Sequence, residues 1–183
     1  MEEFEFSKTL KFINPAIHQE IQLRLLKEEI LPERIDLGMR YAKEIEEGGA
    51  PSHQVKWVSE KVGFGLFAEE DIEPGTFIGE YTGLLRRSDL FETLNGYLYR
   101  YPVTDHLGKH FVIDAKEVGN HTRFINHHFQ PNLKCCWAFH ANLYHMILIA
   151  LKPIAKGDQF SYNYGNAYWA IRGAPELLDL LRN

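Results

Sequence analysis

From Val55 onward the chain consists of short runs rich in β-branched and aromatic residues, separated by glycine, proline and asparagine. Such runs favour β-strands, and their close spacing favours small antiparallel sheets over alternating strands and helices. We expect strands over residues 55–59, 65–68, 76–81, 97–101, 111–114, 133–138, 144–150 and 159–162. The sequence therefore predicts a mainly β fold with added helices.

The first 52 residues predict a helical cap. Asn14 followed by Pro15 favours a helix start, because an asparagine side chain can cap free N–H groups and proline suits the first helical position. The helix is expected to run to about Leu31, where Pro32 stops it. A packed cap is the simpler interpretation, but a helix that is apolar on two faces needs two partners, so a homodimer through these helices is a further expectation. The two apolar sets are Ile17, Ile21 and Leu25, and Leu23, Leu26 and Ile30.

Three further helices are expected. One runs from Asp36 to about Gly48, with Leu37, Tyr41 and Ile45 at intervals of four residues. A short helix is expected over residues 88–95, and another near the end of the chain over residues 176–181.

Charge and composition exclude several classes of function. The net charge is −5, and residues 1–50 carry most of the excess of acidic residues. The sequence has no cluster of lysine and arginine that could bind a row of backbone phosphates, so direct nucleic-acid binding is disfavoured. No apolar run approaches the roughly 20 residues that cross a bilayer, and the acidic start is unlike a secretory signal. We expect no membrane contact and a cytoplasmic or nuclear protein, with delivery into a host cell left open.

The cysteines and histidines predict no metal site. The chain has two cysteines, Cys135 and Cys136, which are too close in sequence for ordinary disulfide geometry and too few for a four-thiolate zinc site. Reduced cysteines fit a cytosolic compartment. His127 and His128 could suggest a metal, but the nine histidines show no spacing typical of one.

Three motifs could carry chemistry. The first, Gly63-Phe64-Gly65, lets the backbone approach a ligand closely, although a tight turn would also explain it. The second, Arg123 to Asn132, offers donors and acceptors that could bind a polar cofactor. The third covers residues 157–165, in which Tyr162 and Tyr164 point to one face of an expected strand, either as packing or as the wall of a pocket.

Together these motifs resemble the SET-domain family of protein lysine methyltransferases. The resemblance runs from about Val55 to Trp169, nearly two-thirds of the chain, and it is specific because several blocks match in order. It implies small antiparallel sheets with a pseudoknot over residues 53–165. The helical cap expected over 1–52 then precedes this domain, and a closing segment with a short helix, expected over 166–183, follows it. The matching blocks are Gly63 to Ala68, Asp71 to Gly83, Phe111 to Ala115, Arg123 to His127 with Pro131-Asn132, and Gly157 to Gly165.

The resemblance also implies S-adenosylmethionine as cofactor and lysine in a protein as substrate, with a histone tail as one candidate. Tyr164 falls at the family's catalytic tyrosine, and a tyrosine at position 162 leans toward mono- or dimethylation. The implied cofactor contacts are Gly63, Phe64, Gly65, Tyr99, Arg123, Phe124, Asn126, His127 and Trp169. The implied channel for the substrate lysine consists of Tyr81, Tyr99, Tyr162 and Tyr164.

One departure and three alternatives stay open. Many family members complete the channel with a cysteine-rich zinc segment, whereas no cysteine follows Tyr164. Tyr168 and Trp169 either cover the adenine with an aromatic face or anchor the tail. The same chemistry could act on a non-histone protein. A different class of function is an inactive module that binds lysine or methyl-lysine by cation–π attraction, but Asn126, His127 and Tyr164 together favour an enzyme.

Overall fold

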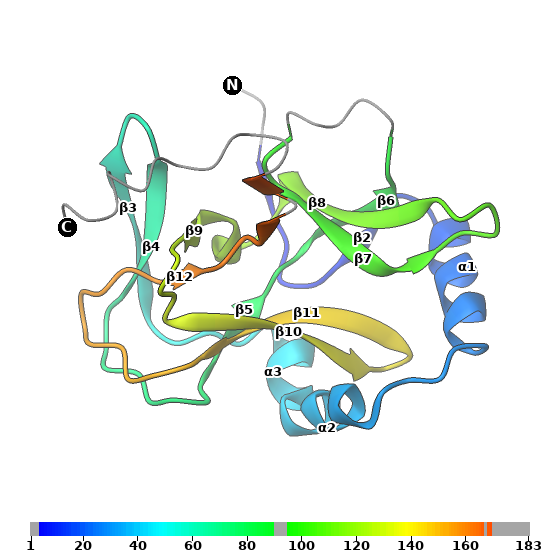
Figure 1. Ribbon diagram of the computed structural model, residues 1–183, viewed down its shortest axis with the longest axis horizontal. Coiled ribbons are helices and arrows are strands. Elements are labelled where there is room, and N and C mark those ends of the chain that lie inside the picture. The colour runs from blue at the N-terminus through cyan, green and yellow to red at the C-terminus, as the bar shows by residue number, and fades with distance from the viewer. Residues whose placement is uncertain (1–3, 90–94, 167, 170–183) are drawn as a thin grey trace.

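Short strands are the commonest secondary structure in the computed structural model, which describes residues 4–89, 95–166, 168 and 169 (Figure 1). The helices are α1 (Pro15–Leu25), α2 (Pro32–Arg40), α3 (Ala42–Glu47) and the 3₁₀ helix η2 (His121–Phe124). The strands are β1 (Glu5–Phe6), β2 (Lys11–Phe12), β3 (His53–Ser59), β4 (Gly63–Ala68), β5 (Phe77–Glu80), β6 (Gly83–Arg87), β7 (Leu98–Thr104), β8 (His110–Gly119), β9 (Asn126–His127), β10 (Leu133–His140), β11 (Leu143–Ala150) and β12 (Ser161–Tyr162). The helices predicted over residues 88–95 and 176–181 lie largely or wholly outside the described residues.

The strands form four small sheets. In the largest, β8 pairs antiparallel with β6 and β7, while β1 and β2 add in parallel to β8 and β6. In the second, β11 lies between β10 and β5, antiparallel to both. A β3–β4 hairpin and a parallel β9–β12 pair complete the set. The mainly β fold is therefore confirmed, although three of the strand pairs are parallel and were not predicted as such.

Helix α1 attaches to the body through one face. Its predicted cap is confirmed, because Asn14 Oδ1 accepts a hydrogen bond of 3.0 Å from the Ile17 N–H. The predicted end at Leu31 is wrong, since the helix ends at Leu25. One apolar set (Ile17, Ile21, Leu25) is buried, whereas Leu23 and Leu26 of the other set are 53% and 76% exposed. The homodimer through this second face stays a prediction.

Helices α2 and α3 cover one face of the β10–β11–β5 sheet (Figure 1). The predicted start at Asp36 is wrong: α2 begins at Pro32, where the fixed φ of proline suits the first helical position. A Cβ at Gly38 would lie 1.9 Å from the Phe139 carbonyl oxygen, so the helix packs backbone to backbone against β10. The predicted apolar spacing is confirmed, because Tyr41 and Ile45 are buried against this sheet.

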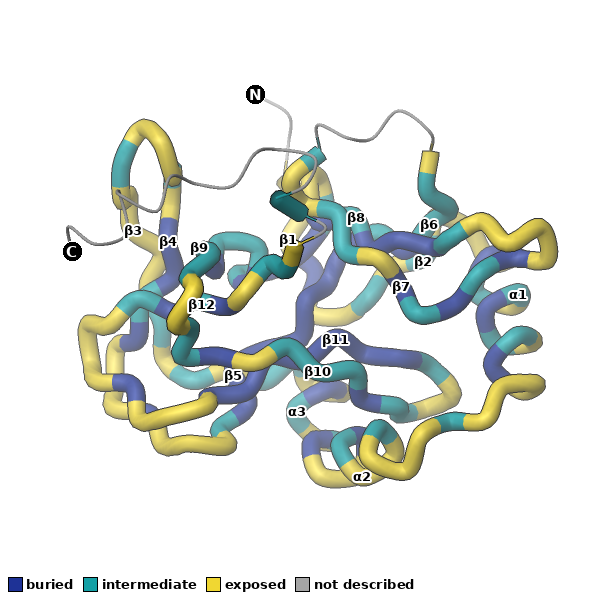
Figure 2. Tube along the Cα trace, viewed as in Figure 1, coloured by how far each residue is buried: buried dark blue, intermediate teal, exposed yellow. Residues whose placement is uncertain are grey.

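The β10–β11–β5 sheet is buried on both faces, and Figure 2 shows β11 and β5 almost wholly in the buried colour. Alternate residues of a strand point to opposite faces. On one face Leu133 and Cys135 join the main core cluster. On the other face Cys136 and Ala138 join a second cluster with α2 and α3. The two adjacent cysteines therefore lie in different environments. Among the described residues, no helix is long and apolar enough to cross a membrane.

Strands β9 and β12 bring together two segments that are far apart in sequence. Asn126 pairs with Ser161, and His127 pairs with Tyr162. Asn132 strengthens the junction, because its Oδ1 accepts from the Ser161 N–H at 2.8 Å and its Nδ2 donates to the Gln159 carbonyl at 2.9 Å. The predicted pseudoknot requires this side-by-side arrangement of the signature and the closing segment.

A buried ion pair links β5 to β11. His145 Nδ1 lies 2.8 Å from Glu80 Oε1, and His145 Nε2 lies 3.2 Å from the His140 carbonyl oxygen. Burial opposes the charged form of His145, but the hydrogen bond and the charge of Glu80 outweigh it and raise the pKa of His145 above its usual value. The charged pair therefore stabilises the fold where His145 is protonated.

We expect His145→Gln to lower the free energy of unfolding by about 2 kcal/mol at pH 6, because a charge-assisted hydrogen bond is lost. The pKa of His145 is raised in the folded chain, so its stabilisation is fully present below the unfolded value of about 6.5. This stabilisation is lost as the pH rises through the pKa of His145 in the folded chain. The difference in unfolding free energy between wild type and variant should therefore shrink with rising pH. Urea unfolding at several pH values from 6 to 9 measures this. His140→Gln, at a more exposed pair with Glu46, is the control, and a pH-independent difference at His145 would contradict the assignment.

Candidate active site

The glycine turn at the start of β4 lies against the signature segment. Gly63 has a φ of +79°, which favours glycine. A Cβ at Gly65 would lie 2.5 Å from Gln159 Nε2 and 2.9 Å from Val58 Cγ2, so a side chain there would require these neighbours to shift. Asn126 Nδ2 donates to the Phe64 carbonyl at 3.0 Å. The structure thus brings together the turn, the signature and the closing segment.

Aromatic rings surround the turn. The Phe64 ring lies 6.1 Å from that of Phe124 and 5.2 Å from that of Trp57, between centroids. Phe64 is 49% exposed and Trp57 is 58% exposed. Trp57 was not among the predicted site residues, although its place on β3, opposite Phe64, could have indicated it.

Arg123 lies on the end of η2 among aromatic side chains. Its guanidinium carbon is 4.2 Å from the centre of the Tyr97 ring and 4.5 Å from that of Phe4. One terminal nitrogen donates to the Lys116 carbonyl at 3.1 Å. Its Nε is buried and has no hydrogen-bond partner among the described residues.

His127 holds Tyr164 in place. The Tyr164 N–H donates to His127 Nδ1 at 3.1 Å, and the Tyr164 hydroxyl donates to the Ile125 carbonyl at 2.9 Å. Because Nδ1 accepts, the ring proton of neutral His127 is assigned to Nε2. Burial, helped by the neighbouring His128, lowers the pKa of His127, so the neutral ring is favoured.

Trp169 packs beside His127 and Tyr164, and the three rings form one corner of the site. Its ring centroid lies 4.9 Å from that of His127 and 6.3 Å from that of Tyr164, nearly parallel to the latter ring. His127 Nε2 and Trp169 Nε1 are both buried without a hydrogen-bond partner in the described part of the chain. Both are N–H donors, so this corner offers buried hydrogen bonds to a ligand rich in acceptors.

The four predicted channel tyrosines lie in one cluster. The ring centroids of Tyr81 and Tyr99 are 5.8 Å apart, and those of Tyr162 and Tyr164 are 4.8 Å apart. Burial is the largest cause that raises the pKa of each of the four phenols above its usual value. The phenols are therefore neutral at physiological pH, and the Tyr81 hydroxyl donates to the Tyr97 carbonyl at 2.9 Å.

Two residues of β10 extend this cluster and were not predicted. The Trp137 ring lies 5.8 Å from the Tyr99 ring between centroids, and Cys135 packs on the same core cluster as these two rings. Burial raises the pKa of the Cys135 thiol to about 12, so the thiol is neutral. The alternation along β10 indicates that Leu133, Cys135 and Trp137 share a face, but the sequence does not show that this face meets Tyr99.

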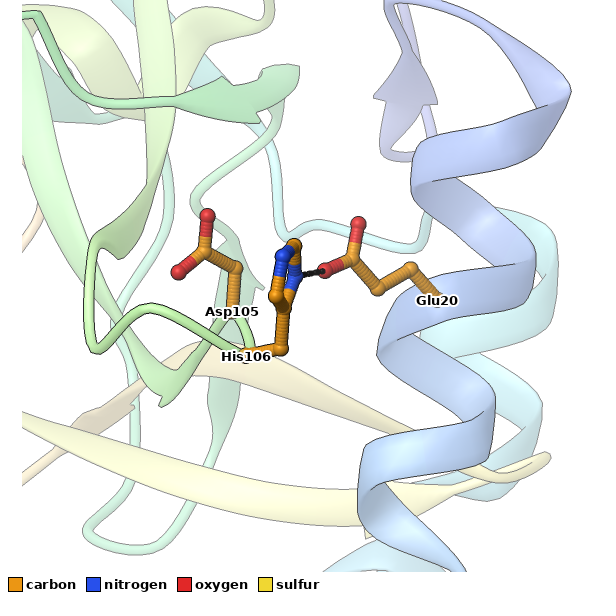
Figure 3. A group of neighbouring side chains, drawn as sticks. All are labelled: Glu20, Asp105 and His106. Carbon is orange, nitrogen blue, oxygen red and sulfur yellow. Dashed lines mark ion pairs between the residues drawn. The ribbon is translucent and has the colours of Figure 1, made fainter.

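Figure 3 shows the one group of three side chains in the described residues whose spacing could suit a metal ion: Glu20, Asp105 and His106. The two carboxylates already have a cationic partner. Arg87 forms an ion pair with Glu20 and a second one, of 3.0 Å, with Asp105. Asp105 also accepts the N–H groups of Leu107 and Lys109. These side chains fit an ionic link between α1 and the β7–β8 turn, and they do not fit a metal ligand set.

Comparisons with known proteins agree with this arrangement. The family model described as "SET domain" matches residues 63–165. The human histone-lysine N-methyltransferase EHMT1 is 33% identical over 116 residues, which are 61% of this chain and 9% of that protein. The chain thus spans about a tenth of that relative's length.

Solved structures show the same fold. A structure of ATXR5 in complex with histone H3.1 mono-methylated on R26 superposes with a TM-score of 0.67 at 22% identity, covering 89% of this chain and 81% of that chain. A structure of ctPRC2 in an autoinhibited conformation bound to S-adenosylmethionine gives a TM-score of 0.56 at 27% identity, covering 73% of this chain and 19% of that chain. The family model matches most of the β-rich part of the chain, and that part contains the tyrosine cluster and the glycine turn. The chain therefore belongs to the SET-domain family.

Proposed function

We propose that this chain transfers a methyl group from S-adenosylmethionine to the side-chain amine of lysine in a protein. The observation that carries the proposal is the position of Tyr164. It belongs to a cluster of neutral tyrosines and is held by His127 and Ile125 beside buried donors that lack partners. Relatives named histone-lysine N-methyltransferases support the same class of activity.

The buried donors fit the proposed cofactor. A buried N–H without a partner costs about 1–3 kcal/mol, which a ligand acceptor can recover. Arg123 Nε, His127 Nε2 and Trp169 Nε1 are such donors, and S-adenosylmethionine has carboxylate, ribose and ring acceptors. When bound, the cofactor supplies an electrophilic methyl group on a sulfonium. The remaining contacts proposed for it are Gly63, Phe64, Gly65, Tyr99, Phe124 and Asn126.

The tyrosine cluster suits the amine partner of the reaction. A lysine amine with a pKa near 10.4 is neutral in about one molecule in a few thousand at pH 7. A closely packed aromatic site disfavours the ammonium form by desolvation. Because the Tyr164 hydroxyl proton is directed to the Ile125 carbonyl, its oxygen lone pairs stay free to contact a polarised methyl group. Alignment of the two reactants in such a site supplies much of the rate.

A histone is the protein substrate we propose to test first. Relatives carry histone-lysine methyltransferase names, and the ATXR5 structure contains histone H3.1. The chain has a net charge of −5, which suits a basic partner. A cytoplasmic or nuclear location is part of the same proposal.

Tyr164→Phe is expected to lower methyl transfer about a hundredfold, because it removes an oxygen positioned at the reacting groups. A radiolabelled-cofactor assay on core histones and on a cell lysate measures the effect. The matched control is Tyr41→Phe. The Tyr41 hydroxyl also donates to a backbone carbonyl, that of Gly75 at 2.8 Å, but in the second core cluster.

Each of these two variants should cost about 1 kcal/mol of stability through its lost hydrogen bond. Loss of transfer in Tyr164→Phe alone supports the proposal. A wild type that transfers no label to any protein, yet binds a lysine peptide, would indicate a binding module.

Tyr162→Phe is expected to raise the methylation state of the product. Tyr162 is buried in the cluster next to Tyr164, and removal of its hydroxyl leaves more room beside the target nitrogen. Mass spectrometry of the product reads the fractions of mono-, di- and trimethyl-lysine. An unchanged distribution would refute this role of Tyr162.

His127→Ala is expected to weaken S-adenosylmethionine binding about tenfold, because one buried donor and the support of Tyr164 are both lost. Isothermal titration calorimetry measures the affinity without any protein substrate. His128→Ala is the neighbouring control, since His128 Nδ1 only accepts the Gln130 N–H. Equal affinities of the two variants would remove His127 from the cofactor site.

A further inference from the structure

The first described residues of the chain reach the signature segment. Phe4 directly precedes β1, which pairs in parallel with the last residues of β8. Ser7, directly after this strand, is fixed on both sides of its backbone. Its N–H donates to the Gly119 carbonyl at 2.7 Å, and its carbonyl accepts from the Thr82 hydroxyl at 2.7 Å. The backbone therefore holds Phe4 at a defined place beside β8.

Phe4 is one of three aromatic rings around the guanidinium of Arg123. The guanidinium carbon lies 4.2 Å from the centre of the Tyr97 ring, 4.5 Å from that of Phe4 and 5.2 Å from that of Phe124. A guanidinium within about 6 Å of a ring centre is attracted to the face of the ring. The Phe4 and Tyr97 rings are 39% and 37% exposed, yet Arg123 Nε is buried. The rings thus shield this cation from water, which strengthens the attraction.

Arg123 keeps hydrogen-bonding capacity that the protein does not use. One terminal nitrogen donates to the Lys116 carbonyl of β8 at 3.1 Å. The buried Nε has no partner in the part of the chain that the structure describes. No ion pair within that part includes Arg123. A buried N–H and a positive charge are therefore available to a ligand.

The contacts of Arg123 order it before any ligand binds. An arginine side chain has many rotamers, and fixing it on binding costs conformational entropy. Contacts that fix it in the free protein lower this cost and so raise affinity. Strand β8 carries both the Lys116 carbonyl and the residues that pair with β1. One strand therefore sets the positions of Phe4 and of the guanidinium that its ring covers.

We propose that Phe4 is a positioning residue of the cofactor site. Its ring holds the guanidinium of Arg123 in the orientation in which Nε can donate to S-adenosylmethionine. The proposal rests on the function proposed above. Phe4 acts through Arg123 and not by its own contact with a reactant. The N-terminal segment, expected from the sequence as a cap without chemistry, then contributes to cofactor affinity.

Variants at position 4 test whether the aromatic face matters. Isothermal titration calorimetry measures the affinity for S-adenosylhomocysteine, the product that remains after methyl transfer. Phe4→Ala and Phe4→Leu should both weaken binding about fivefold, although leucine keeps most of the apolar volume. Phe4→Tyr keeps the ring and should stay within about twofold of wild type. The control is Phe6→Ala on the same strand, at a ring that is 57% exposed, and it should also stay within about twofold.

A double-mutant cycle tests whether Phe4 acts through Arg123. Arg123→Met removes the charge and the N–H donors but keeps a long unbranched side chain, and it should weaken binding about tenfold. Residues that act through one contact have non-additive effects. Phe4→Leu should therefore cause no further loss in the Arg123→Met background. A fivefold loss in both backgrounds would overturn the proposal.

Steady-state kinetics separate positioning from general support of the fold. With core histones as substrate, Phe4→Leu should raise the KM for S-adenosylmethionine about fivefold and leave kcat within about twofold, because only binding is weakened. A structural role would instead lower the melting temperature and kcat together, in Phe4→Tyr as well as in Phe4→Leu. That result would contradict the proposal.

The outcomes separate this proposal from the proposed function. If wild type binds S-adenosylhomocysteine and Phe4→Leu binds it equally well, the role of Phe4 is refuted and the methyltransferase function stands. If wild type binds it but transfers no methyl group to any protein, the methyltransferase function fails, and calorimetry still decides for or against Phe4. If wild type binds none, both proposals are overturned.

Discussion

The parallel pairing of β9 with β12 is the contact on which the active site depends. It places His127 beside Tyr162 and lets the next residues of the closing segment reach His127 and Ile125. Two backbone strands of two residues each could not hold such a junction alone. Asn132 adds two side-chain hydrogen bonds across it. Tyr164 is thus oriented by segments nearly 40 residues earlier in the chain, and disruption of the junction would separate the glycine turn and the signature from Tyr162 and Tyr164.

The tyrosine cluster is built to stay neutral. Each phenol is buried enough for its pKa to be raised, and two of the hydroxyls are bound to backbone carbonyls. Buried polar groups cost stability unless they are paired. The hydrogen bonds of Tyr81 and Tyr164 reduce this cost and fix the two rings at the same time. The same contacts therefore serve both the stability of the fold and the chemistry proposed for the site.

Strands that are rich in apolar or β-branched residues could be predicted from the sequence. Contacts between residues far apart in the chain could not. Residues 146–150 are a continuous apolar run within β11, which is buried along almost its whole length. In contrast, β1, β2 and β9 have two residues each, too few to show alternation, and they exist only because a longer strand provides hydrogen-bond partners. The glycine turn, the signature and the paired tyrosines could be found as motifs. Trp137 could not, because its place in the cluster depends on β10 meeting Tyr99 across two sheets.

The first strands of the chain have a consequence for where this domain can be divided. β1 pairs with the last residues of β8, beyond the part of β8 that pairs with β7. β2 pairs with the edge of β6 that faces away from β8. Uncovered strand edges are templates for pairing with other chains. Residues 5–12 thus protect two edges of the sheet, and they also bring the Ser7 carbonyl to the buried Thr82 hydroxyl at 2.7 Å. A protein shortened to begin at residue 53 would expose both edges. Removal of the N-terminal segment would therefore promote aggregation, which means that this segment is not a separable cap.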